Sequence, residues 1–176
     1  MIKPLTRLIF ANHRNYLITL LSVILIALAL AHLSEAWLAL KPCKLCHYQR
    51  YIYYAMVVVM SLGLIIFPQG KPLKLVFLVS ILLLIAEVLI AGYHTGIEFD
   101  IFSPWQGCFN HSEATDLAQL KQDLLNATAV TCEKVTFRFL GLSLAAWNYL
   151  FSLLLLVISI YYFFLAQKDN NKSVTD

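Results

Sequence analysis

Residues 73–93 read LKLVFLVSILLLIAEVLIAGY, and Lys74 and Glu87 are the only charged side chains in this stretch. A helix needs about 20 consecutive apolar residues to cross the hydrocarbon core of a bilayer. The stretch is therefore predicted to be a transmembrane helix. Outward from it, three further apolar runs predict spans at about 16–40, 48–67 and 144–165, so we expect an all-α membrane protein, a four-transmembrane-helix bundle.

The composition agrees with this assignment. The chain has 176 residues, of which 60% are hydrophobic and 13% charged, whereas a soluble domain is about half apolar and a quarter charged. Four spans occupy roughly half the chain. This leaves room for one long loop but not for a second domain, so we expect residues 1–176 to form a single membrane domain. The formal charge of +3 is small and indicates cytoplasmic anchoring of loops, with no nucleic-acid partner.

The connections between the spans differ in length. Residues 41–47 form a short polar loop that contains Pro42, and proline cannot continue the first helix. Residues 94–143 form the one long loop. Leucines recur within it at helical spacing and predict a short amphipathic helix, which either lies on the membrane or packs over the bundle. These leucines are Leu117, Leu120, Leu124 and Leu125.

The first run has a second interpretation as a cleaved signal peptide. It follows a basic stretch, and Ala29-Leu30-Ala31 resembles a cleavage site. Against cleavage, the run is longer than the apolar region of a usual signal peptide and leads directly into the short loop. We therefore expect it to remain as the first span.

Basic residues near the span ends predict the orientation, because cytoplasmic loops are enriched in lysine and arginine. Placing both termini in the cytoplasm puts seven such residues inside and six outside, and the long loop is net acidic. Four cysteines and three tryptophans then face the outer side, as an interfacial aromatic belt would. They are Cys43, Cys46, Cys108, Cys132, Trp37, Trp105 and Trp147.

Cys43 and Cys46 form a C-x-x-C motif where the second span begins. Residues three apart share a helix face, so the two sulfurs can bond. The unpaired amides and dipole of a helix N-terminus, together with Arg50 one turn on, should lower the pKa of the Cys46 thiol. Arg50 itself needs a partner at the edge of the apolar zone, either a thiolate or a quinone oxygen, unless it only snorkels to the surface.

Two other interpretations of the motif compete with redox chemistry. It could be half of a zinc site, which would need further ligands at suitable spacing. Cys43-Lys-Leu-Cys46-His47 also matches the c-type haem attachment pattern. Haem, however, explains neither the second cysteine pair nor Arg50, and the motif lies tight against two spans. We expect no metal.

Cys108 and Cys132 lie in the long loop. A bond between them would close a loop of about 25 residues and contribute roughly 3.5 kcal/mol of stability in the chain-entropy model. The pair is either a structural staple or a second redox pair. In the second case a loop pair could meet a soluble partner and pass electrons to the membrane-edge pair by thiol–disulfide exchange.

Glu87 and His94 lie seven residues apart and share one stripe of the third span. His94 is at the depth of Cys46, and Glu87 lies about two turns deeper. An acid inside the membrane suggests a function, here a proton relay, with His94 bonding a quinone. The alternative is a satisfied polar pair inside the bundle, with Glu87 bonded to His32 or to another helix.

The segment Pro42–Arg50, PCKLCHYQR, matches the P-C-x-L-C-x-x-Q-R pattern of the disulfide bond formation protein B (DsbB) family. The segment Phe139–Trp147, FLGLSLAAW, resembles that family's entry into its last helix. The resemblance covers nearly the whole chain. The loop between Cys108 and Cys132 has no clear match beyond the cysteines, which leaves the choice of partner open.

The resemblance implies a thiol:quinone oxidoreductase of the bacterial inner membrane, with its cysteines in the periplasm. It implies a bound ubiquinone or menaquinone and a DsbA-like thioredoxin-fold periplasmic oxidase as partner. It also implies that the partner attacks Cys108, that Cys132 then attacks Cys43, and that Cys46 leaves and faces the quinone. The residues it implicates are the redox disulfides Cys43–Cys46 and Cys108–Cys132, with Arg50, His94 and Gln49 at the quinone.

Overall fold

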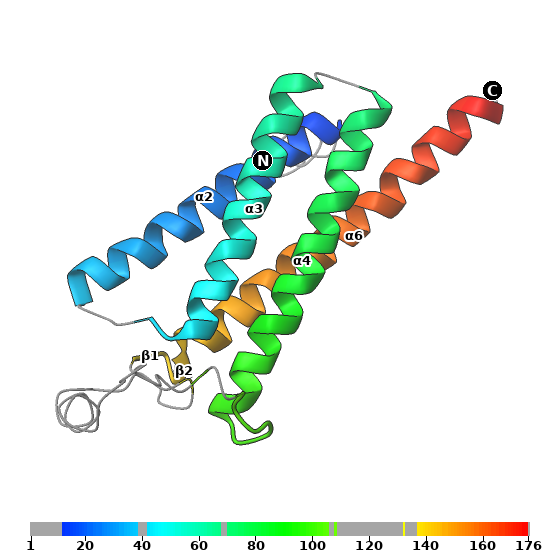
Figure 1. Cartoon of the computed structure of the whole chain (residues 1–176). Helices are drawn as coiled ribbons and strands as arrows, with labels where there is room; N and C mark the ends of the chain where they lie inside the picture. The colour runs from blue at the N-terminus through cyan, green and yellow to red at the C-terminus, as the bar shows by residue number, and fades with distance from the viewer. Residues whose placement is uncertain are drawn as a thin grey trace, which may run out of the picture.

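The computed structural model describes residues 12–38, 42–67, 70–105, 108, 132 and 137–175, and the side chains of these except residues 71 and 166–175. Long helices dominate, and they are drawn with a short hairpin in Figure 1. The elements are α2 (His13–Leu38), α3 (Lys44–Ile66), α4 (Lys71–Glu98), β1 (Arg138–Phe139), β2 (Leu142–Ser143) and α6 (Leu144–Thr175).

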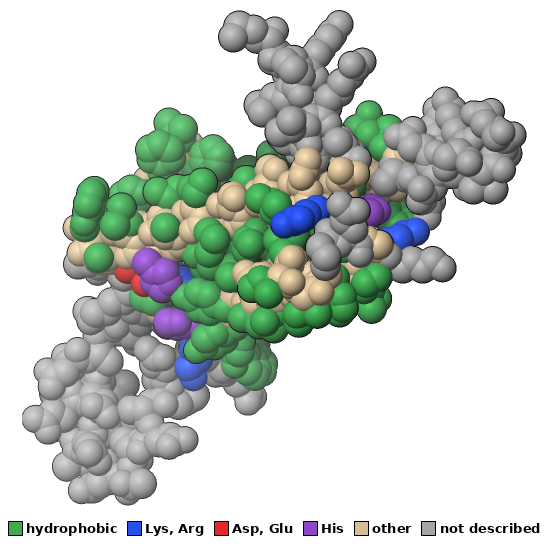
Figure 2. Space-filling model, turned by 90° about the horizontal axis from the view of Figure 1, so that it is seen from above, with side chains coloured by type: hydrophobic (Ala, Val, Ile, Leu, Met, Phe, Trp, Pro, Cys, Tyr) green, Lys and Arg blue, Asp and Glu red, His purple; other side chains and the backbone are tan. Residues whose placement is uncertain are grey.

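Within the described residues, four helices are long and apolar enough to cross a membrane, which confirms the predicted four-helix membrane fold. Their outward faces carry large hydrophobic side chains, among them Leu30, Ile65 and Leu82, each at least 60% exposed. Figure 2 shows hydrophobic side chains over most of the described surface in that view, with few charged ones. Such a surface suits contact with lipid rather than water. The spans are His13–Leu38, Lys44–Ile66, Pro72–Glu98 and Leu144–Leu165.

Helix α4 lies between α3 and α6, and α2 packs mainly against α3 (Figure 1). The core between the helices is formed by fully buried side chains such as Ile24, Met56, Phe77 and Leu84. Its far end is closed by aromatic packing in which the Tyr16 and Tyr162 rings stack at 4.3 Å. These contacts fix the helices relative to one another, which positions side chains at their other ends.

The hairpin before α6 orients the start of that helix. Strands β1 and β2 pair antiparallel, and Leu140 and Gly141 between them both have positive φ, as a tight two-residue turn requires. The Ser143 hydroxyl accepts a hydrogen bond from the Ala146 amide at 3.0 Å and so caps the first turn of α6. The Trp147 indole donates to the Phe139 carbonyl at 2.9 Å and ties the helix to the hairpin.

Some helix bounds differ from the predicted spans. Helix α4 continues past Tyr93 to Glu98, because hydrogen bonding continues after the apolar run ends. Helix α3 begins at Lys44, four residues before the predicted start of the second span at residue 48. Trp37 lies in the last turn of α2 and Trp147 in the first turn of α6, while Trp105 follows α4 outside any helix. The helix predicted around Leu117–Leu125 lies outside the described residues.

Candidate thiol redox site

Cys43 and Cys46 lie at the start of α3, where the sequence analysis placed them. Cys43 has extended backbone and is the N-cap residue, with helical structure beginning at Lys44. Its Sγ accepts a hydrogen bond from the Cys46 amide at 3.4 Å and lies 3.0 Å from the Cys46 Sγ. Both cysteines are free thiols, so the structure shows the reduced form of the pair. We expected the helix terminus to act on Cys46, but the terminal amide donates to Cys43.

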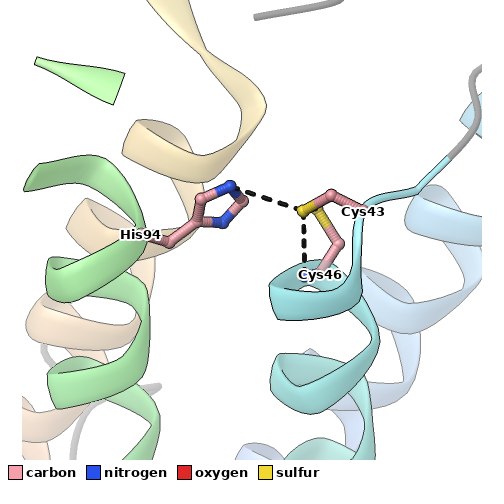
Figure 3. Close-up of side chains that lie close together, drawn as sticks. All are labelled: Cys43, Cys46 and His94. Atoms are coloured by element: carbon pink, nitrogen blue, oxygen red, sulfur yellow. Dashed lines mark hydrogen bonds between the residues drawn. The ribbon is translucent and has the colours of Figure 1, made fainter. Parts of the chain in front are cut away.

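The His94 side chain reaches from α4 to the same sulfur. Figure 3 shows its imidazole facing Cys43, with Nε2 at 3.5 Å from Sγ. Cys43 is only 6% exposed. Hydrogen bonds from Cys46 and His94, together with the charge that His94 carries when protonated, lower the pKa of the Cys43 thiol against the opposing effect of burial. The arrangement favours a thiolate at Cys43, the form that attacks disulfides.

The second cysteine pair lies beside the first. Cys108 and Cys132 form a disulfide with a Cα–Cα distance of 5.5 Å, and each is 2% exposed. Both belong to one buried cluster with Cys43, Leu45 and Ile97. The backbone of Cys132 also interacts with the His94 imidazole. The predicted Cys108–Cys132 bond is present, and the fold brings the two cysteine pairs together.

Arg50 is paired with Glu35 on α2, a residue that was not singled out from the sequence. Its two terminal nitrogens donate to the two Glu35 carboxylate oxygens at 2.7 and 2.5 Å. The Arg50 charge also acts on Cys46 one turn earlier. Two opposite charges near the same end of adjacent spans were a signal that could have identified this pair.

Gln49 and Glu87 are joined through Asn148, a residue the sequence analysis did not single out. Gln49 is 5% exposed, and its Nε2 lies 3.4 Å from His94 Nδ1. The Asn148 amide nitrogen donates to Gln49 Oε1 at 3.2 Å and to Glu87 Oε1 at 2.8 Å. Glu87 does not pair with His32; its partner lies on another helix, α6, which the same alternative allowed. An amide just inside the last span was the available signal for Asn148.

His32 and Glu98 have other partners near this end. The His32 Nε2 lies 2.5 Å from the Tyr54 hydroxyl, and its Nδ1 lies 3.9 Å from Glu35. Glu98 Oε1 lies 3.9 Å from His94 Nε2, and Glu98 Oε2 accepts a hydrogen bond from Ser143 at the start of α6. Glu98 therefore connects the end of α4, the hairpin and the imidazole that faces Cys43.

The arrangement limits which groups the site could hold. Among the residues that the structure describes, Cys43, Cys46 and His94 place three possible metal ligands within 4.8 Å of one another, and a structural zinc site uses four. Haem attachment would require both thiols to bond the haem and His47 to ligate its iron. His47 is exposed, however, while Cys43 is buried. A quinone needs hydrogen-bond donors for its carbonyl oxygens. The described side chains offer them at this end, because Arg50 has five N–H groups and Glu35 takes two.

These features define a class: a four-span membrane protein with a thiol pair and a disulfide side by side at one end of its helix bundle. The family model described as disulfide bond formation protein DsbB matches residues 13–162. The chain belongs to the DsbB family. Members of this family are generally oxidoreductases of disulfide bond formation and are typically quinone-linked.

Two relatives match over most of their length. The chain is 26% identical over 143 residues to the uncharacterized protein RP370 of Rickettsia prowazekii (strain Madrid E). The aligned region covers 80% of this chain and 81% of the relative. It is 27% identical over 140 residues to disulfide bond formation protein B of Pasteurella multocida (strain Pm70), which covers 78% of each. No solved structure matches the chain.

Proposed function

We propose that this protein is a quinone-dependent thiol oxidoreductase that reoxidises a DsbA-like thioredoxin-fold oxidase. One observation carries the proposal: a disulfide and a reduced C-x-x-C pair share one buried cluster at one end of a four-span bundle. A structural staple needs no second cysteine pair next to it. Two adjacent pairs suit electron transfer by thiol–disulfide exchange.

The exchange begins at the loop disulfide. A partner thiolate attacks Cys108, the Cys108–Cys132 bond breaks, and Cys132 leaves as a thiolate. Cys132 then attacks Cys43 of an oxidised Cys43–Cys46 pair, and Cys46 leaves as a thiolate. The partner's second thiol displaces Cys108 and the partner departs oxidised. Cys108 then attacks Cys132, which restores the loop disulfide and leaves Cys43 and Cys46 reduced by two electrons.

Cys43 suits its place in this sequence. It lies in the cluster with Cys132, which favours it as the sulfur that receives the attack. When Cys108 displaces it, Cys43 must leave as a thiolate, and a thiol with a low pKa leaves faster. Hydrogen bonds from the Cys46 amide and from His94 stabilise that thiolate.

The last acceptor in the proposal is a membrane quinone, either ubiquinone or menaquinone, which when bound accepts two electrons and two protons. Cys46 is the proposed quinone-facing sulfur because it is less buried than Cys43 and feels the charge of Arg50. Arg50, Gln49 and His94 are the proposed contacts. Each presents N–H donors near the thiol pair, and a carbonyl oxygen needs such donors.

The proposed location is the bacterial inner membrane with both termini in the cytoplasm. All four cysteines then face the periplasm, where disulfides persist. The four cysteines lie together in one cluster, which agrees with a single redox face. Labelling of single introduced cysteines with an impermeant reagent in intact cells tests this orientation.

Turnover in nanodiscs tests the function. The purified protein with a short-chain ubiquinone should oxidise a reduced thioredoxin-fold oxidase, and serine at Cys43, Cys46, Cys108 or Cys132 should stop turnover. Full activity of Cys108→Ser would overturn the relay. His47→Ala should retain activity and is the matched control for the haem interpretation. Covalently attached haem in the purified protein would instead support that alternative.

The partner is best identified by trapping. In a Cys132→Ser variant, the mixed disulfide between the partner and Cys108 cannot be resolved by Cys132. A thioredoxin-fold protein bound to Cys108 in cells would support the proposal. Absence of any Cys108 adduct, while the same variant retains turnover, would contradict it.

A further inference from the structure

A continuous chain of hydrogen bonds leads from the thiol pair into the middle of the bundle. It starts at Cys43, passes through His94 on α4 and Gln49 on α3, and reaches Asn148 on α6. From Asn148 it ends at Glu87, about two turns below His94 on α4. The chain therefore crosses three of the four helices and connects a buried acid with the redox sulfur.

Glu87 lowers the stability of the bundle at its position, because burying an acidic side chain in a membrane span costs free energy. It is fully buried within a membrane span. Its Oε1 accepts from Asn148, while its Oε2 is buried without a hydrogen-bond partner among the residues that the structure describes. A buried acid with an unsatisfied oxygen destabilises a bundle, so its presence calls for an explanation beyond packing.

The polarity of the chain follows from Glu87. In the structure the Asn148 NH₂ group donates to Glu87 Oε1 at 2.8 Å, so this carboxyl oxygen is the acceptor. The same nitrogen also donates to Gln49 Oε1 at 3.2 Å. The Asn148 carbonyl oxygen then faces the other way, and it accepts from the Tyr53 hydroxyl at 2.9 Å.

The same polarity reaches the imidazole. Because Gln49 Oε1 accepts from Asn148, the Gln49 NH₂ group is the one that faces His94 Nδ1, at 3.4 Å. Nδ1 is then the acceptor, and in a neutral imidazole the proton must lie on Nε2. Nε2 is the nitrogen that faces the Cys43 sulfur.

We propose that Glu87 and Asn148 are positioning residues that hold His94 with its proton on Nε2, directed at the sulfur of Cys43. The inference rests on the proposed function, because its consequence is a more stable reduced thiol pair. A His94 with the opposite tautomer would present a lone pair to the Cys43 thiolate and repel it. A stabilised reduced pair makes the corresponding disulfide a stronger oxidant.

The other groups around the chain agree with this polarity. Glu98 lies 3.9 Å from His94 Nε2, on the same side as Cys43, and it too favours a proton at that nitrogen. The Cys132 backbone is the remaining group from the loop that interacts with the imidazole. Around Glu87, the described titratable neighbour from α3 is Tyr53, whose hydroxyl bonds Asn148.

The experiment reads the imidazole and the thiol pair directly, in nanodiscs without quinone. Ring nitrogen NMR shifts of labelled histidine report the His94 tautomer, and equilibration with a glutathione buffer reports the dithiol–disulfide balance of Cys43 and Cys46. Glu87→Gln keeps the side-chain shape, but the glutamine amide can donate a hydrogen bond to Asn148. The Asn148 side-chain amide can then flip and exchange the positions of its NH₂ group and its oxygen. We expect a mixture of His94 tautomers and a shift of about tenfold toward the Cys43–Cys46 disulfide, as for one lost charge-assisted hydrogen bond.

Three further variants separate polarity from packing. Asn148→Leu breaks the same link from the other side and should reproduce both effects, which covers the case that Glu87→Gln does not fold. Tyr53→Phe removes the hydrogen bond from Tyr53 to Asn148 but keeps the bond between Asn148 and Glu87. This variant should therefore keep the wild-type His94 tautomer. Ser80→Ala changes a buried polar residue of α4 that bonds only its own helix, and it should change neither readout.

A wild-type tautomer with an unchanged thiol equilibrium in both Glu87→Gln and Asn148→Leu would overturn the inference. So would a wild-type His94 that carries its proton on Nδ1. Neither readout needs quinone turnover. If the proposed function fails, turnover is absent but the Glu87 and Asn148 variants still change the His94 tautomer. This result is therefore distinguishable from a failure of the inference.

Discussion

Arg50 on α3 and Glu35 on α2 face each other in a two-bonded ion pair at the end of the bundle that carries the thiols. Their side chains are 14% and 22% exposed, so the pair is largely removed from solvent. The guanidinium is thus held in one place, in contrast to a side chain that only snorkels to the surface. Glu35 takes two of the five N–H groups of Arg50, and the Arg50 charge acts on Cys46.

The first prediction concerns the stability that this pair confers. Arg50→Ala and Glu35→Ala each leave one charge uncompensated, so each should lower the free energy of unfolding by about 1–3 kcal/mol. The double variant should lose about 1 kcal/mol less than the sum, because the two side chains interact. Unfolding by SDS in mixed micelles measures these values. Arg14 is exposed at the other end of α2, so the losses in unfolding free energy caused by Arg14→Ala and Glu35→Ala should add. If the losses caused by Arg50→Ala and Glu35→Ala also add, Arg50 and Glu35 are not coupled.

The second prediction separates the structural role of Arg50 from a role in quinone use. If Arg50 contacts the quinone, Arg50→Ala should raise the apparent KM for a short-chain ubiquinone by about tenfold, the value of one charge-assisted hydrogen bond. Glu35→Gln keeps Arg50 in place and should raise it less. Arg14→Ala is the matched basic control. An unchanged KM in Arg50→Ala, measured on protein that remains folded, would leave Arg50 with a structural role only.

The third prediction concerns the pH dependence of Cys43. Hydrogen bonds from Cys46 and His94 lower the pKa of this thiol. An ordinary thiol has a pKa of about 8.5, and the Cys43 thiolate therefore persists at pH values below that pKa. The stabilisation of the reduced protein is therefore present above that ordinary value and is lost only as the pH falls through the lowered pKa.

Ultraviolet absorbance of the thiolate measures this pKa in a Cys46→Ser variant. There Cys43 is the one free thiol, because Cys108 and Cys132 are bonded. The variant retains a hydroxyl donor and should titrate below an ordinary cysteine. Adding His94→Ala should move the midpoint upward by roughly one pH unit. A midpoint near that of an ordinary thiol with His94 present would contradict the prediction.

The span pattern and the thiol motif could be predicted from the sequence because both are local signals. An apolar run of sufficient length predicts a span wherever it packs, and Pro42 between two such runs predicts that one helix ends and the next begins near the C-x-x-C. His94 could be placed at the depth of the thiols by counting turns along α4. The structure adds that it points at Cys43, on the buried side of the pair.

The partners of Arg50 and Glu87 could not be predicted in the same way. Each depends on how a helix is rotated about its axis and on which helix lies next to it, and neither is encoded in one span. Depth alone allowed Glu87 to pair with His32 on α2. Because α4 packs against α6, its buried face meets Asn148 instead.

The last prediction tests the close approach of α3 and α4 at Gly63. A methyl group at Gly63 would lie 2.6 Å from a Val76 methyl carbon, too close for unstrained packing. Gly63→Ala should therefore push α3 from α4 and lower the free energy of unfolding by about 1–3 kcal/mol. Val76→Ala removes the clashing methyls, so adding it should recover most of the loss, as SDS unfolding would show. If Gly63→Ala folds with wild-type stability, or if Val76→Ala fails to restore it, the close approach of the two helices at this point is not what fixes them.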